Sequence, residues 1–138
     1  MERPVVVLVP EPQRSSRIFT EDVRNELERR FRLIDLEGKA EGLDEVLGDA
    51  FAIIGQPDLP ATRLQRAPRL RALLNVEGNF YQNVDYPVCF ERGIYVLGCG
   101  PAYAHAVAEY ALGLALDLAR GISREDRAFR AKRERYVL

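Results

Sequence analysis

A short polar segment carries residue types suited to binding an anion. Residues 75–85 read N-V-E-G-N-F-Y-Q-N-V-D and follow an apolar run. Open α/β sheets bind ligands at the carboxyl ends of their strands, and backbone N–H groups around Gly78 and Asn79 could receive a carboxylate or a phosphate. The same spacing also fits a plain strand-to-helix turn in which Asn83 or Asp85 caps the helix, so both interpretations stay open.

A second glycine-containing segment resembles a phosphate-binding loop only in part. Residues 98–103 read G-C-G-P-A-Y, where a dinucleotide-binding fingerprint would read G-x-G-x-x-G. Tyr103 occupies the third glycine position, and Asp117 lies in an expected helix rather than at a strand end. We therefore interpret the segment as a tight exit loop in which Gly98 and Gly100 tolerate unusual backbone angles.

The residues able to act as nucleophile, base or metal ligand are few. His105 is the only histidine and follows Cys99 by six residues, but a Cys–His pair also needs an orienting group. Because His105 lies in the most apolar stretch of the chain, we expect it to pack or to make a buried hydrogen bond. One histidine and two cysteines match no structural zinc pattern, so no metal is expected. Glu77 and Glu109 remain candidates for proton transfer, with nothing to pair them.

The elements that would position these residues alternate between strand and helix. The run of residues 5–9, V-V-V-L-V between two prolines, predicts a strand buried on both faces. We expect further strands at 31–36, 50–55, 70–76 and 94–97, with helices at 20–31, 41–47, 60–66 and 84–92. This alternation is typical of βαβ units. The sequence therefore predicts an α/β fold with an open parallel sheet of about five strands and helices on both faces.

The C-terminal part differs in kind. Residues 102–119 are almost all apolar, and a helix that is apolar all round must be covered all round, by a second domain or a second subunit. Residues 120–138 hold seven basic and three acidic side chains, which predicts a charged amphipathic helix with Ile122 and Phe129 on its inner face. An electrostatic docking surface is the alternative. The apolar ending, residues 136–138, is typical of a chain that continues into a strand or a neighbouring domain.

Composition argues against several classes of function. The 138 residues contain 20 basic and 21 acidic side chains, with a net charge of -1, which argues against binding to a nucleic-acid backbone. Neither a membrane span nor a secretion signal is expected. Two cysteines in a chain long enough to bury a core fit a reducing cytoplasm.

Six segments, in order, resemble the D-isomer-specific 2-hydroxyacid dehydrogenase family. The resemblance is clearest over residues 50–135. It implies a flavodoxin-like substrate-binding domain at 1–100, then interface helices at 101–138 that lead into a Rossmann cofactor domain absent from this chain. The matching segments are A-P-R-L-R-A at 67–72, L-L-N-V-E-G-N at 73–79, N-V-D at 83–85, R-G-I-Y-V at 92–96, V-A-E-Y-A-L at 107–112 and L-A-R at 118–120.

The resemblance also implies substrate-binding residues. Glu77, Gly78 and Asn79 resemble the loop whose backbone amides hold the substrate carboxylate in the family. Phe80 stands at the second glycine position of that loop, a departure that would narrow the pocket or change which amides point inward. Gln56, at the end of the third expected strand, faces the same cleft by topology.

Two positions in the apolar stretch complete the expected site. Tyr103 falls where many family members have an asparagine near the substrate, and Val107 matches a residue that lies against the nicotinamide ring. The family's catalytic arginine, glutamate and histidine come from the part absent here. No catalytic residue is therefore assigned, and His105 is not the family's histidine.

The function implied for the intact protein is that of an NAD(P)-dependent oxidoreductase. It would act on the CH–OH group of a D-2-hydroxy acid, or reduce a 2-keto acid, as a homodimer formed through residues 102–119. We expect the 138-residue chain alone to bind no cofactor and to be inactive. The alternative is a stand-alone flavodoxin-like binding or dimerisation module. A signalling receiver domain is disfavoured, because residues 10–12 read P-E-P where paired acids are needed and Gln56 follows the third strand.

Overall fold

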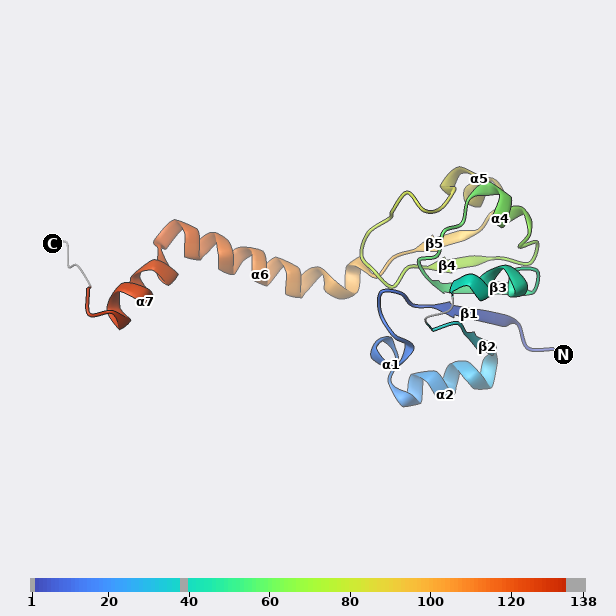
Figure 1. The fold of residues 1–138 in the computed structure, drawn as a ribbon, viewed down its shortest axis with the longest axis horizontal. Coiled ribbons are helices and arrows are strands. Elements are labelled where there is room, and N and C mark those ends of the chain that lie inside the picture. Colours follow the sequence, from blue (N-terminus) through green and yellow to red (C-terminus); the bar gives the residue numbers. More distant parts are fainter. Residues whose placement is uncertain (1, 38–39, 134–138) are drawn as a thin grey trace. The chain divides into compact units, whose positions relative to one another are not determined.

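The computed structural model describes residues 2–37 and 40–133. Five parallel strands form one open sheet in the order β2-β1-β3-β4-β5 (Figure 1). This is a flavodoxin-like arrangement, so the predicted α/β class is confirmed. The strands are β1 (Val5–Val9), β2 (Arg32–Asp35), β3 (Ala50–Gly55), β4 (Ala72–Leu74) and β5 (Tyr95–Leu97).

The helices and strands follow the predicted alternation, with one difference in a helix and one in a strand. A one-turn helix, α1, lies within a segment expected to be mostly loop, and β4 is shorter than the expected strand 70–76. Leu70 and Val76 are nevertheless buried, which explains why the apolar run looked longer than the strand itself. The helices of this part are α1 (Ser15–Ile18), α2 (Glu21–Arg30), the 3-10 turn η1 (Ala40–Gly42), α3 (Leu43–Val46), α4 (Ala61–Gln65) and α5 (Tyr86–Glu91).

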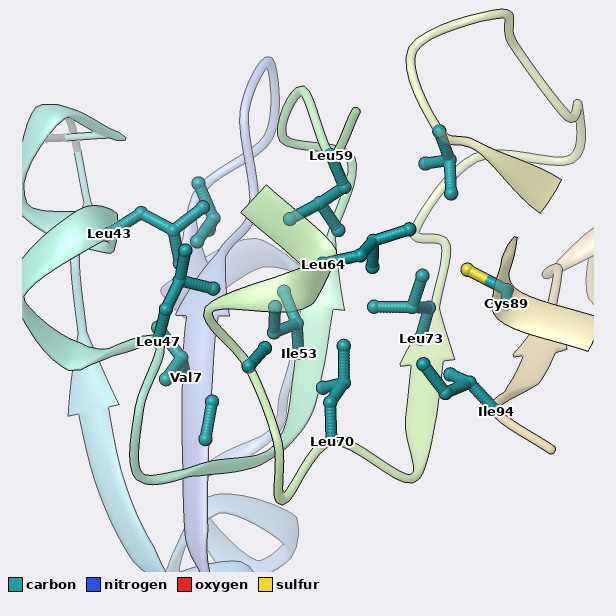
Figure 2. Close-up of a cluster of buried hydrophobic side chains, with 14 of the residues drawn as sticks. Val7, Leu43, Leu47, Ile53, Leu59, Leu64, Leu70, Leu73, Cys89 and Ile94 are labelled. Carbon is teal, nitrogen blue, oxygen red and sulfur yellow. The ribbon is translucent and has the colours of Figure 1, made fainter. Parts of the chain in front are cut away.

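The sheet is covered on both faces, as its strand composition requires. The larger core lies between the sheet and α3, α4 and α5, where Leu43, Leu64 and Cys89 are fully buried (Figure 2). On the other face, Val6 and Leu8 pack with Phe19 and other apolar side chains near α2. Alternate β1 residues thus face opposite cores, which confirms that this strand is buried on both sides.

Gly55 ends β3 in a conformation that other residues rarely adopt. Its φ is +138°, and a Cβ built on it would lie 1.7 Å from the backbone oxygen of Val9. A side chain at this position would therefore collide with the last residue of β1. This close approach fixes where the chain leaves the sheet, immediately before Gln56.

The chain divides into two compact units, residues 1–100 and 101–138. The second contains α6 (Gly100–Arg120), which starts at the boundary, and α7 (Ile122–Arg130). Between them, Gly121 has a φ of +66°, and Asp117 accepts hydrogen bonds from the Ser123 amide and hydroxyl at 2.5 and 2.8 Å. These contacts lower the pKa of Asp117. They define the turn between the two helices.

The apolar side chains of the second unit are exposed. Leu118 of α6 is 85% exposed, and Ile122 and Phe129 of α7 are 55% and 64% exposed. The expected burial of Ile122 and Phe129 on an inner face is therefore wrong for the chain as it stands. Residues 136–138 lie outside the described part. None of the described helices combines the length and hydropathy that a membrane-spanning helix requires.

Candidate functional site

The segment after β4 is fastened to the segment that leaves β5. Asn75 donates its backbone N–H to the Leu97 oxygen at 2.8 Å, and the Cys99 amide donates to the Glu77 oxygen at 3.3 Å. The Cys99 thiol donates to the backbone oxygen of Asn75 at 3.0 Å. Parallel pairing between β4 and β5 brings these backbones together. Residues 75–80, which we call the binding loop, therefore begin from a fixed position.

Two glutamines hold Glu77 within the binding loop. The Gln56 side-chain oxygen accepts the backbone N–H of Glu77 at 3.2 Å. From the loop after β1, the Gln13 Nε2 donates to the Glu77 carboxylate, also at 3.2 Å. Gln56, which topology predicted to lie near the loop, is thus in direct contact with it. Gln13 was missed, because its distance of 64 residues from Glu77 is bridged only by sheet pairing.

Asn83 fixes the position of Gln56 in turn. Its Nδ2 donates to the backbone oxygens of Gln56 and Pro57 at 2.9 and 3.0 Å. Of the two residues considered as helix caps, Asp85 takes that role by accepting the Val88 amide at 3.1 Å. Asn83 instead ties the end of the loop to the end of β3.

Three consecutive amides of the binding loop remain available. Within the described residues, the backbone N–H groups of Gly78, Asn79 and Phe80 donate no hydrogen bond, and all three residues are exposed. The Glu77 amide, which the sequence grouped with them, is already taken by Gln56. Free backbone N–H groups on successive residues are donors that can hold an anion. A carboxylate or a phosphate is thus the kind of group that these amides could bind.

Aromatic contacts fix the far end of the loop. The rings of Phe80 and Tyr86 meet edge to face, with 6.1 Å between centroids and an interplanar angle of 86°. The Tyr86 hydroxyl donates to the Tyr81 backbone oxygen, and burial raises the pKa of Tyr86. Phe80 itself is 58% exposed, so the side chain that replaces the second glycine stands at the edge of the loop.

The glycines of the exit loop differ from expectation. Neither Gly98 nor Gly100 has a positive φ, so the exit loop does not use the left-handed conformation that glycine tolerates. A Cβ at Gly98 would lie 3.4 Å from the Phe80 ring, and one at Gly100 would lie 3.7 Å from the Gly78 oxygen. Both are ordinary contacts, so the surrounding chain would accommodate a Cβ at either position. With Tyr103 in the third position, this segment does not fit a dinucleotide.

The remaining expected residues lie on α6, in the second unit. Tyr103 and Val107 are 46% and 62% exposed. His105 is also exposed in this chain, so its expected packing or buried hydrogen bond stays a prediction for the covered helix. Among residues 2–37 and 40–133, no cluster of three or more His, Cys, Asp or Glu side chains could hold a metal ion.

Comparison with solved structures supplies relatives. A phosphoglycerate oxidoreductase from Rhizobium etli is 42% identical and superposes with a TM-score of 0.72, covering 96% of this chain and 41% of its own. The D-mandelate dehydrogenase of Rhodotorula graminis, at 24% identity and a TM-score of 0.69, also covers 96% of this chain and 41% of its own. The second likeness shows the shared fold.

A third structure agrees in fold. The NADPH-dependent glyoxylate/hydroxypyruvate reductase from Sinorhizobium meliloti is 22% identical, with a TM-score of 0.64, and covers 96% of this chain and 39% of its own. No protein-family profile and no curated protein matches the sequence. By its structural neighbours, the chain is a relative of the D-isomer-specific 2-hydroxyacid dehydrogenases, of whose length it spans about two fifths.

Proposed function

We propose that residues 1–100 form the substrate-binding domain of an NAD(P)-dependent oxidoreductase that acts on a D-2-hydroxy acid or the matching 2-keto acid. The observation that carries this proposal is the binding loop, in which three exposed amides remain available while Glu77 is held by Gln13 and Gln56. The 42% identity to a phosphoglycerate oxidoreductase supports the reaction class.

In this proposal the chain's own residues bind and orient the substrate. The amides of Gly78, Asn79 and Phe80 donate to the substrate carboxylate, and the Glu77 carboxylate, a like charge, is kept engaged by the Gln13 amide. Phe80 adds an apolar edge that limits the size of the substrate's side chain. For Tyr103 and Val107, contacts with the substrate and the nicotinamide are proposed from the family resemblance alone.

Cofactor binding and proton transfer belong to the remaining part of the enzyme. When bound there, NAD or NADP supplies hydride chemistry at the substrate's C2 carbon. This chain offers no dinucleotide fingerprint, so we propose that the 138 residues alone bind no cofactor and have no dehydrogenase activity. NAD(P)H-dependent turnover of a 2-keto acid by the isolated chain would contradict this statement.

Carboxylate binding can be tested on the 138-residue chain by NMR. Titration with glyoxylate, a small 2-keto acid, should shift the amide signals of Gly78, Asn79 and Phe80 in a saturable way. Methyl glyoxylate, which lacks the negative charge, is the matched ligand and should leave them in place. Saturable shifts confined to other parts of the sheet would refute the assignment.

We also propose that α6 forms a homodimer interface. The supporting observation is the exposure of its apolar side chains, including Leu112 and Leu116 at 61% and 50%, because apolar surface of this extent favours association. The same observation favours the second candidate function, a stand-alone module that dimerises without catalysis. Sedimentation velocity should give a dimer for the unmodified chain and a monomer for Leu112→Glu/Leu116→Glu.

The two candidate functions separate on what the gene encodes beyond codon 138. Continuation into an apolar strand with G-x-G-x-x-G, followed by an arginine, a glutamate and a histidine, supports the dehydrogenase. A stop codon supports the dimerisation module. Because sedimentation tests only the interface, a dimer is compatible with both functions, whereas the reading frame distinguishes them.

A further inference from the structure

A hollow lined by arginines lies at the amino ends of the strands, at the end of the sheet opposite the binding loop. Its volume is about 380 Å³, within the range of small-molecule sites. Val5 and Arg32 begin β1 and β2, and Phe51 and Arg71 lie at the starts of β3 and β4. Because parallel strands share one direction, their amino ends meet at this edge, whereas the binding loop follows a carboxyl end.

The hollow holds an excess of positive charge. Arg3, Arg32, Arg69 and Arg71 line it, against two acidic residues, of which Asp49 pairs with Arg69 at 3.4 Å. The whole chain carries a net charge of only -1. Four basic and two acidic side chains therefore concentrate two uncompensated positive charges in one place.

Two of the arginines have no side-chain partner among the described residues. Among the described residues, neither Arg32 nor Arg71 makes a side-chain hydrogen bond or ion pair. Arg3 donates only to the backbone oxygen of Glu28, which leaves its charge uncompensated. Arginine stays protonated at all ordinary pH values, so these side chains are available to pair with an anion that enters the hollow.

The backbones of the two unpaired arginines are fixed by the sheet. Arg32 donates its backbone N–H to Pro4 at 2.9 Å, and the Arg71 N–H donates to Phe51 at 2.8 Å. Tyr95 in turn donates to the Arg71 oxygen at 2.9 Å. Both side chains thus start from well-defined positions, and binding an anion would order only the side chains themselves.

We propose that this hollow binds the phosphate group of a small phosphorylated molecule, with Arg32 and Arg71 as its main ligands. A guanidinium fork matches phosphate in bidentate geometry and holds it more specifically than an ammonium does. Phe51 and Pro68 add apolar surface beside the arginines, which suits the organic part of a phosphate ester. This site is independent of the proposed dehydrogenase function.

Binding can be measured on the full 138-residue chain with inorganic phosphate and with phenyl phosphate, at constant ionic strength set by sodium chloride. We expect saturable shifts of the amide signals of Val5, Arg32, Phe51 and Arg71, and a ligand-dependent rise in Tm. Tighter binding of phenyl phosphate would assign the apolar wall to an ester. Equal binding of the two would assign the site to the phosphate group alone.

Arg32→Gln/Arg71→Gln should weaken phosphate binding at least tenfold. The matched control is Arg17→Gln/Arg120→Gln, which removes the same charge from two exposed arginines elsewhere and should bind as the unmodified chain does. Arg32→Lys/Arg71→Lys keeps the charge but loses the fork, and should give intermediate affinity even if the glutamine variant folds poorly. Absence of saturable shifts, or equal weakening in the control, would overturn the proposal.

Discussion

At the scale of single residues, the Gln56 side chain positions the binding loop. Gln56→Ala removes the acceptor of the Glu77 amide, and a typical hydrogen bond of this kind contributes about 1 kcal/mol. We therefore expect about fivefold weaker binding of glyoxylate, measured by the same NMR titration. Gln82→Ala, an exposed glutamine near the loop, is the control and should leave the affinity unchanged. An equal effect of both substitutions would argue against a positioning role.

Gly55 is the residue whose replacement should cost the most stability. Alanine there would combine a φ of +138° with a Cβ 1.7 Å from the Val9 oxygen, so β1 and β3 would have to separate. We expect Gly55→Ala to lower the free energy of unfolding by at least about 3 kcal/mol, measured by urea denaturation. Gly48→Ala, where a Cβ meets nothing within 4 Å, should change it by less than about 1 kcal/mol.

At the scale of elements, an ion pair joins α3 to α4. Arg63 contacts both Asp44 carboxylate oxygens at 3.0 Å, and Arg66 reaches the same residue at 3.2 Å. The Arg63 hydrogen bonds hold the pKa of Asp44 below its ordinary value of 3.8. Since the folded-state pKa is the lower one, the stabilisation is fully present above that ordinary value and is lost as the pH falls through the folded-state pKa.

The difference in free energy of unfolding between Asp44→Asn and the unmodified chain should therefore become smaller as the pH falls. Urea denaturation at pH 6 and near pH 3 measures the difference. Arg63→Gln removes the partner instead and should give the same dependence on pH. A difference that stays constant across this range would show that the pair does not link α3 to α4 energetically.

The sequence predicted elements better than contacts. Apolar β-branched runs bounded by proline or glycine, such as residues 5–9 and 50–55, identified buried strands because parallel sheets require them. The single turn α1 was missed because four residues cannot show helical periodicity. Gln13 was missed, and Asn83 was considered only as a helix cap. Their partners lie 64 and 26 or 27 residues away, and only the fold of the sheet brings them together.

At the scale of the whole molecule, Cys89 should report on global unfolding. This residue of α5 is fully buried in the larger core (Figure 2), and burial raises the pKa of its thiol. In a Cys99→Ser variant, we expect alkylation of Cys89 at neutral pH to proceed only through unfolding and to accelerate in parallel with the urea transition. Labelling of the native chain at the rate of an unfolded peptide would show that this core opens locally.

Because all the strands run in one direction, the length of the strands separates the hollow at their amino ends from the binding loop at a carboxyl end. β1 has five residues, which at about 3.3 Å per residue span roughly 17 Å. A small metabolite is shorter than this, so no single molecule can contact the binding loop and the arginine-lined hollow together. A keto acid and a phosphate compound could consequently bind to the protein at the same time. Saturation with one ligand should not displace the other.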